Sequence, residues 1–182
     1  MLMRPLYQNH FSLVTQKIQS DPFTITHIMQ KEIQYSHLNK KDLKEVELLQ
    51  TTNIKEINNV WNFDEMLLFI LKKESFSRVA KFNKIIIGFS FFLKIQDTLE
   101  VFLIFVEPKY RRKGIARKFF EDGINFCQAN LINQILLEVN VVNKNAICFY
   151  EKINFKKVRL RENYYSIGQR KYDALVMQYV LS

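Results

Sequence analysis

The stretch that decides the fold reads Val106-Glu107-Pro108-Lys109-Tyr110-Arg111-Arg112-Lys113-Gly114-Ile115-Ala116. It begins at the end of an apolar strand, which Pro108 terminates because proline cannot donate to a hydrogen-bond ladder. A basic turn then leads into a helix, whose start offers unpaired N–H groups and a positive dipole end to an anion. Gly114 lets the backbone approach a pyrophosphate closely. Taken alone, the stretch also fits a solvated basic turn in which Gly114 serves only the geometry.

Hydrophobic periodicity predicts strands and helices on both sides of this stretch. Upstream, residues 99–106 are almost wholly apolar, so both faces of this strand should be covered. Downstream, apolar residues from Ile115 to Leu131 recur at helical spacing. The other expected strands cover 33–38, 76–82, 84–95, 134–140, 155–162 and 172–181, and the other expected helices lie near 43–49, 63–72 and 143–153. These elements predict an α/β (α+β) fold, a mixed sheet with helices on both faces.

The length of the chain bears on its domain organisation, and its charge bears on its partners. Its 182 residues suit one domain, here residues 31–182, preceded by an extension of unknown role at residues 1–30. Residues 1–20 faintly resemble a transit peptide, although an added helix or a loose arm is the favoured interpretation. The net charge of +9 favours anionic partners, but lysines on solvated faces explain it equally well. No recognisable nucleic-acid-reading motif is present.

Two features that the sequence lacks narrow the possible classes of protein further. No run of about 18 apolar residues exists, so no membrane partner is expected. Cys127 and Cys148 fall in helical segments without disulfide or metal-ligand spacing, which predicts a cytoplasmic protein with no metal. Either thiol could be a nucleophile, but buried, inert thiols are the preferred interpretation. The three histidines have no visible triad or metal partner.

Three polar residues after the basic turn can each be interpreted as structural or as functional. Glu138 interrupts an apolar strand, where a carboxylate is costly unless it is solvated through a cleft, paired with a cation or functional. Tyr150 lies on a helical stripe with Ile147 and Ile153, the usual pattern of a core aromatic. Asn143 is placed to cap a helix. The residues alone leave these alternatives open.

The motifs together resemble the GNAT superfamily of acetyltransferases. Arg111-x-x-Gly114-x-Ala116 matches its acetyl-CoA signature Q/R-x-x-G-x-G/A, in which alanine is a permitted last residue. The similarity continues through Leu136-Leu137-Glu138-Val139, Asn143-x-x-Ala146-Ile147-x-Phe149-Tyr150-Glu151-Lys152-Ile153-Asn154-Phe155 and Arg159-x-Arg161-x-Asn163-Tyr164-Tyr165. Within the superfamily the chain is most similar to the RimI-type ribosomal-protein alanine N-acetyltransferases, over about residues 32–181.

This resemblance implies a GNAT fold, whose mixed sheet is mostly antiparallel, and acetyl-CoA as co-substrate. It implies Glu138 as general base and Tyr150 as general acid. The residues that it assigns to acetyl-CoA are Ile104, Phe105, Val106, Arg111, Arg112, Lys113, Gly114, Ile115, Ala116, Arg117 and Asn143. Those that it assigns to the peptide are Trp61, Arg161, Asn163, Tyr164 and Tyr165, the last four in an expected polar loop between the final two strands.

The function implied is that of an acyltransferase, more narrowly an N-acetyltransferase that modifies a protein N-terminus. The RimI-type resemblance suggests the N-terminal alanine of a small-subunit ribosomal protein. Relatives often carry Pro-Trp before the second helix, where this chain has Val60-Trp61, so the peptide is less firmly implied than acetyl-CoA. A GNAT enzyme for a small amine or a lysine side chain, and a non-catalytic acetyl-CoA-binding module, remain alternatives.

Overall fold

A computed structural model of the chain describes residues 32–57 and 60–181. The chain divides between Ile33 and Gln34, and the unit Gln34–Ser182 contains the sheet. The expected extension at residues 1–30, with any targeting role, lies outside the described residues. No helix in the described part is long and apolar enough to cross a membrane.

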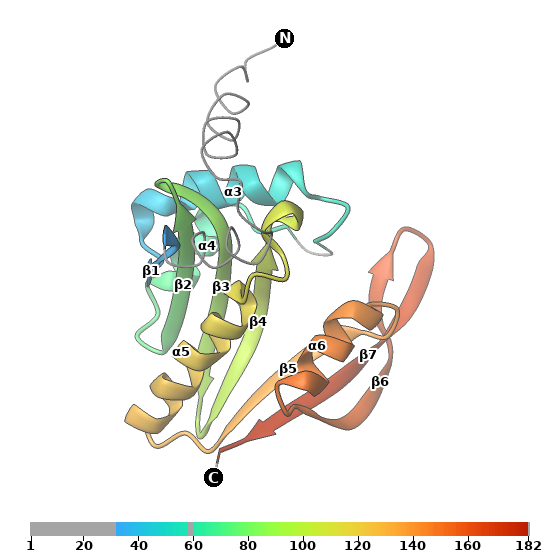
Figure 1. Cartoon of the computed structure of the whole chain (residues 1–182). Helices are drawn as coiled ribbons and strands as arrows, with labels where there is room; N and C mark the ends of the chain where they lie inside the picture. The colour runs from blue at the N-terminus through green and yellow to red at the C-terminus, as the bar shows by residue number, and fades with distance from the viewer. Residues whose placement is uncertain (1–31, 58–59, 182) are drawn as a thin grey trace, which may run out of the picture. The chain divides into compact units, whose positions relative to one another are not determined.

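In the described residues, seven strands form one sheet in the order β1-β2-β3-β4-β5-β7-β6 (Figure 1). The strands are β1 (Gln34–His37), β2 (Ser75–Phe82), β3 (Ile85–Ile95), β4 (Thr98–Val106), β5 (Gln134–Asn140), β6 (Lys156–Ile167) and β7 (Arg170–Val180). Neighbouring strands are antiparallel except β4 and β5, which are parallel. The expected mixed, mostly antiparallel sheet is confirmed.

Local capping signals set where several helices begin. The helical elements are η1 (Lys40–Asp42), α3 (Leu43–Thr52), α4 (Phe63–Ile70), η2 (Pro108–Tyr110), α5 (Ile115–Ala129) and α6 (Lys144–Lys152). Asn62 caps α4 by accepting a hydrogen bond from the Glu65 N–H at 3.0 Å, and Glu65 accepts one from the Asn62 N–H at 2.8 Å. Asn39 caps η1 with Asp42 in the same reciprocal way.

Helices cover both faces of the sheet around β3. On one face, α3 and α4 pack Val46 and Met66 into a core with Phe89 and Phe91. On the other face, α5 lies against the sheet, where Phe126 stacks on Phe76 with ring centroids 4.5 Å apart. Gly123 of α5 packs against Leu99 and Phe92, where a Cβ would lie at an ordinary contact distance, 3.5 Å from Leu99. The prediction of helices on both faces is confirmed.

The parallel pair β4–β5 is incomplete, and this opens the sheet. The two strands pair only from Thr98–Gln134 to Val101–Leu137. In Figure 1 they meet near the C-terminus and diverge from there. On the other side of β4, Phe91 pairs with Leu103 and Phe92 with Val101, which leaves Phe102 unpaired in a bulge.

The expectation that both faces of residues 99–106 are covered is therefore wrong for residues 102–104, whereas Phe105 and Val106 are buried. Phe102 is 44% exposed, and Leu103 and Ile104 are only half-buried. The apolar run suggested burial, but these residues line the opening between two strands, and their packing is only partial, as where the Phe102 ring lies 5.2 Å from that of Phe69. Apolar content alone does not distinguish the two environments.

The expected polar loop between the last two strands is also wrong, because β6 and β7 continue almost to Gly168. A bulge between Arg161 and Tyr165 absorbs the polar residues, after which Tyr165 pairs with Tyr172. Asn163 adopts a left-handed conformation (φ 54°), and its N–H donates to Asp173 at 2.8 Å. Arg161, Asn163, Tyr164 and Tyr165 thus belong to a strand.

The two cysteines lie in different environments. Cys127 is buried in α5, and burial raises the pKa of its thiol to about 11, so the prediction of an inert core thiol holds there. Cys148 is exposed on α6, so the expectation of burial is wrong for it. The helix turns Ile147 inward, which places the next residue on its outer side.

Tyr35 on β1 gives a prediction about alkaline stability. Burial, with Asp122 and Glu121 nearby, raises the pKa of its phenol to about 12, whereas a tyrosine in the unfolded chain ionises near 10. Below pH 10 the phenol is neutral in both states and has no effect on the pH dependence. Between pH 10 and 12 the unfolded state loses its proton first, so the free energy of unfolding falls as pH rises.

Tyr35→Phe keeps the ring that packs on Phe119 and removes this titration. We expect the variant to lose less stability than the wild type between about pH 9 and about pH 11, measured by urea unfolding. Parallel losses in the two proteins would show that Tyr35 does not contribute to alkaline destabilisation.

Candidate active site

A cleft of about 750 Å³ occupies the opening between β4 and β5. Its walls combine the diverging strands, α6, the β6–β7 hairpin and the segment before α4. These elements are far apart in sequence, and the sheet order brings them together. The cleft therefore contains half of the residues that the sequence resemblance selected from distant motifs, whereas Val106, residues 111–117 and Asn163 do not line it.

The β4 wall presents main chain that β5 does not pair. Leu103, Ile104 and Phe105 line the cleft beyond the last β4–β5 pair at Val101. N–H and C=O groups on this edge are open to a ligand that lies along the strand. The Val106 carbonyl is already engaged, because it accepts a hydrogen bond from Nε of Arg111 at 3.0 Å.

The basic turn follows directly from this wall. Gly114 caps α5 with φ 82°, a left-handed conformation that favours glycine, and no side chain caps the helix there. Ile115 is buried and anchors the first turn, while Ala116 is half-buried. Arg112 and Arg117 are exposed, and Lys113 is half-buried. The turn therefore carries cations at an open, 15-residue helix N-terminus.

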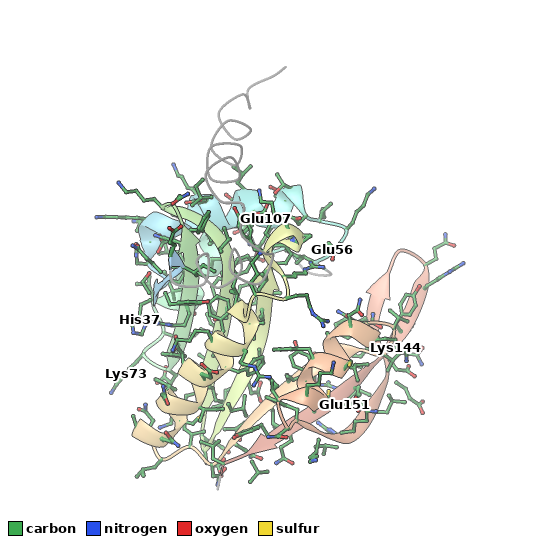
Figure 2. All side chains as sticks on the ribbon, in the orientation of Figure 1. His37, Glu56, Lys73, Glu107, Lys144 and Glu151 are labelled. Carbon is green, nitrogen blue, oxygen red and sulfur yellow. The ribbon has the colours of Figure 1, made fainter. Side chains whose placement is uncertain are left out.

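Arg111 has a structural role within this turn. Besides its bond to Val106, it donates to Glu56 at 3.0 Å and lies over the Phe105 ring at 5.9 Å from its centroid. Glu56, labelled in Figure 2, lines the cleft from the segment after α3. Arg111 thus ties the turn to the cleft wall.

Glu138 projects into the cleft from β5. Its neighbours Leu137 and Val139 are buried, while Glu138 is half-buried and lines the cleft. Its carboxylate forms an ion pair with Arg161, and the Tyr165 hydroxyl donates to its main-chain carbonyl at 3.2 Å. The carboxylate is therefore stabilised within an apolar strand in two ways: it is solvated through the cleft, and it is paired with a cation.

Tyr150 lines the same cleft from α6. Its ring also packs against Phe120 and Phe155, with centroids 5.7 Å and 5.8 Å away, so both sequence interpretations describe part of its environment. Burial, with a contribution from Tyr165, raises the pKa of the Tyr150 phenol well above its usual value. Tyr150 therefore remains a neutral hydrogen-bond donor at physiological pH.

Asn143 caps α6 and also lines the cleft. Its side-chain oxygen accepts a hydrogen bond from the Ala146 N–H at 3.1 Å, as the capping interpretation predicted. Asn143 and Ala146 both line the cleft. Lys144 and Glu151, labelled in Figure 2, both belong to α6.

The β6–β7 hairpin contributes an aromatic and cationic wall. Arg161, Tyr164 and Tyr165 line the cleft, and the Arg161 guanidinium lies 4.1 Å from the Tyr164 ring centroid. A hydrogen bond to the Glu138 side chain raises the pKa of Tyr164, while burial is the main cause that raises the pKa of Tyr165 to about 12. Asn163 is not among the residues that line the cleft.

Trp61 lines the opposite side and is held firmly. Its ring lies 5.1 Å from those of both Phe69 and Phe91. Gln50, which is fully buried, donates from Nε2 to the Trp61 carbonyl and accepts from the Trp61 N–H, both at 3.0 Å. Val60 stands where relatives often carry proline, and Gln50 of α3 fixes the main chain at Trp61.

Sequence reasoning missed several residues in the cleft. The main additions are Glu56, Glu100, Phe102, Asn140 and Arg159. Glu100 left a usable signal, because it is the one acidic residue in the apolar run from Leu99 to Val106. Arg159 stands in the motif Arg159-x-Arg161 but was given no role there. The other three left no signal, since their position depends on the strand divergence and on pairing between distant segments.

Comparison with known proteins agrees with this geometry. The profile of the Acetyltransferase (GNAT) family matches residues 41–155. The [ribosomal protein bS18]-alanine N-acetyltransferase of Escherichia coli K12 is 32% identical over 88 residues, 48% of this chain and 60% of that protein. An N-alpha-acetyltransferase of Saccharolobus solfataricus is 43% identical over 70 residues, 38% of this chain and 42% of that protein. The chain thus spans only part of the length of these relatives.

Solved structures show the same fold. The ribosomal-protein-S18-alanine N-acetyltransferase of Escherichia coli superposes with a TM-score of 0.73 at 23% identity, covering 82% of this chain and 94% of that one. Arabidopsis thaliana NAA60, in complex with a bisubstrate analogue, gives 0.72 at 17% identity, covering 81% and 97%. With more than half of its residues in the family match, the chain belongs to the GNAT family of acetyltransferases.

Proposed function

We propose that this protein is an acetyl-CoA-dependent N-acetyltransferase that modifies the α-amino group of a protein N-terminus. The observation that carries the proposal is the placement of Glu138 and Tyr150 in one cleft between diverging strands. The relatives named as bS18-alanine N-acetyltransferases favour an N-terminal alanine of a ribosomal protein as the acceptor.

The residues present fit acetyl-CoA, which supplies an acetyl group activated as a thioester. The α5 N-terminus and the cations Arg112, Lys113 and Arg117 would hold its phosphates. The unpaired β4 edge would bind its amide-bearing arm. Asn140 supports the fit independently: it lines the cleft, and its Nδ2 is buried without a partner in the described residues.

Glu138 and Tyr150 match the two proton transfers that the reaction requires. An amine must be neutral to attack, and an α-amino group with pKa 7.7–8.0 is about a fifth to a third neutral at pH 7.4. Glu138 would accept the remaining proton, directly or through one water. Tyr150, whose phenol is neutral at this pH, would donate a proton to the departing thiolate.

The same arithmetic favours an N-terminus over a lysine side chain. A lysine with pKa near 10.4 is only about 0.1% neutral at pH 7.4, so it demands a much stronger base. A carboxylate that is already paired with Arg161 suits the easier acceptor. Tyr164, Tyr165 and Trp61 add the aromatic walls against which a peptide would pack.

A thiol-release assay with acetyl-CoA tests the proposal through three acceptors. The first is a peptide with a free N-terminal alanine, the second the same peptide blocked at its N-terminus but carrying a lysine, and the third a polyamine. We expect release with the first alone. Release with the polyamine alone would identify a small-molecule acetyltransferase, and acetyl-CoA binding without release would identify a binding module.

The hairpin gives a prediction about peptide binding. Because Tyr164 lines the cleft on the hairpin side, Tyr164→Ala should raise the peptide KM about tenfold while changing the acetyl-CoA KM little. Tyr164→Phe is the matched control, since it keeps the ring and removes only the hydroxyl that bonds Glu138. Equal rises in both KM values would argue against a peptide-binding role for the hairpin.

A further inference from the structure

Glu100 is a second carboxylate in the cleft. It lies on β4, is half-buried, and lines the cleft with Glu138. Across the parallel pair it faces Leu136, two residues before Glu138, so the two carboxylates project from the same face of the sheet. The charges of both carboxylates also raise the pKa of Tyr164, although a hydrogen bond to Glu138 is the largest cause.

The two carboxylates differ in what they bind. Glu138 is paired with Arg161 and bonded to Tyr164. Glu100 forms no hydrogen bond or ion pair within the part of the chain that the structure describes. The other charged and titratable groups that line the cleft are Glu56, Tyr150, Arg159 and Tyr165. A half-buried carboxylate without a partner, facing a cleft, is suited to a cationic ligand.

The acceptor itself supplies such a cation. At pH 7.4 about two thirds or more of a peptide's α-amino groups carry the proton, so the substrate arrives mainly as an ammonium ion. An ammonium has three N–H donors and gains most from a carboxylate that is not already neutralised by a cation.

We infer that Glu100 binds the substrate's α-ammonium group, and that Glu138 then receives its proton. This inference rests on the proposed function and assigns substrate binding and proton transfer to two different carboxylates. Glu100 is a substrate-binding residue that sets the affinity for the charged amine, whereas Glu138 acts on the chemical step. Removal of Glu100 should therefore raise KM for the peptide, and removal of Glu138 should lower kcat.

Glu100→Gln tests whether the two carboxylates have separate roles, since glutamine keeps the size of the side chain and loses its charge. Near pH 7 the peptide KM should rise about tenfold, with kcat and the acetyl-CoA KM within about twofold of wild type. Near pH 9, where the amine is mostly neutral, the effect on KM should shrink to about twofold. Glu121→Gln is the matched control, because it removes one negative charge at an exposed position of α5, outside the cleft.

A peptide that lacks its α-amino group separates binding of the ammonium from a structural role. Its inhibition constant should be the same for wild type and Glu100→Gln, because it carries no charge for Glu100 to bind. An equal weakening of this inhibitor, or a fall in kcat at unchanged KM, would overturn the inference while leaving the proposed function intact. A wild-type protein that acetylates no peptide would overturn both.

Discussion

Glu138→Gln is expected to lower kcat about 10²–10⁴-fold near pH 7, with little change in acetyl-CoA affinity. Glutamine preserves the size of the side chain and can still accept a hydrogen bond from Arg161, but it cannot accept a proton from the amine. The loss should shrink as pH rises, because above the amine's pKa the nucleophile is already neutral. Steady-state rates from about pH 6.5 to about pH 9.5, with calorimetric titration of acetyl-CoA, measure both effects.

Arg161→Gln is the control that separates the base from its ion pair. This variant also breaks the Glu138–Arg161 pair, but it keeps the carboxylate. If Glu138 acts as a base, Arg161→Gln should retain far more of kcat than Glu138→Gln. Equal losses in the two variants would mean that the ion pair holds the cleft in shape, and a near wild-type rate for Glu138→Gln would remove the base assignment.

Tyr150→Phe is expected to lower kcat by a similar factor of about 10²–10⁴, because the leaving thiolate loses its proton donor. The ring that packs against Phe120 and Phe155 is kept, so the fold should be unaffected. Unlike the Glu138 variant, this one should not recover at high pH, since its defect does not concern the amine. The measurement is the same pH–rate profile, run beside a thermal unfolding curve.

Tyr179→Phe provides the matched control for Tyr150. Tyr179 belongs to the same aromatic cluster, with its ring 5.6 Å from that of Phe155, but it does not line the cleft. Its loss of a hydroxyl should leave kcat unchanged. If Tyr150→Phe is as active as Tyr179→Phe, Tyr150 is a core aromatic and solvent protonates the thiolate.

Much of the fold could be predicted because its signals are local. The capping residue Asn143, and the proline that ends β4, act within a few positions of where they stand. The hairpin was misjudged because a bulge at Asn163 keeps polar residues inside a strand. Its polar composition is typical of a loop, and only pairing with β7 shows otherwise.

Apart from Glu100, the candidate site was predictable only where a family motif marks a residue. Glu138 and Tyr150 were selected by resemblance, and the structure places both in one cleft. Two contacts in the site join residues that are distant in sequence: the ion pair of Glu138 with Arg161 and the hydrogen bond from Gln50 to the Trp61 main chain. No local pattern encodes such contacts, because they depend on strand order and on the divergence of β4 from β5.

The most direct test of N-terminal acetylation is to locate the acetyl group on the product. A peptide with a free N-terminal alanine and one internal lysine is incubated with the protein and acetyl-CoA, and fragmentation in a mass spectrometer assigns the modified residue. Glu138→Gln and a reaction without protein serve as controls for spontaneous acetylation. We expect one acetyl group on the N-terminal residue, formed by the wild type and nearly absent in both controls. An acetyl group on the lysine alone, or an unmodified peptide, would contradict this expectation.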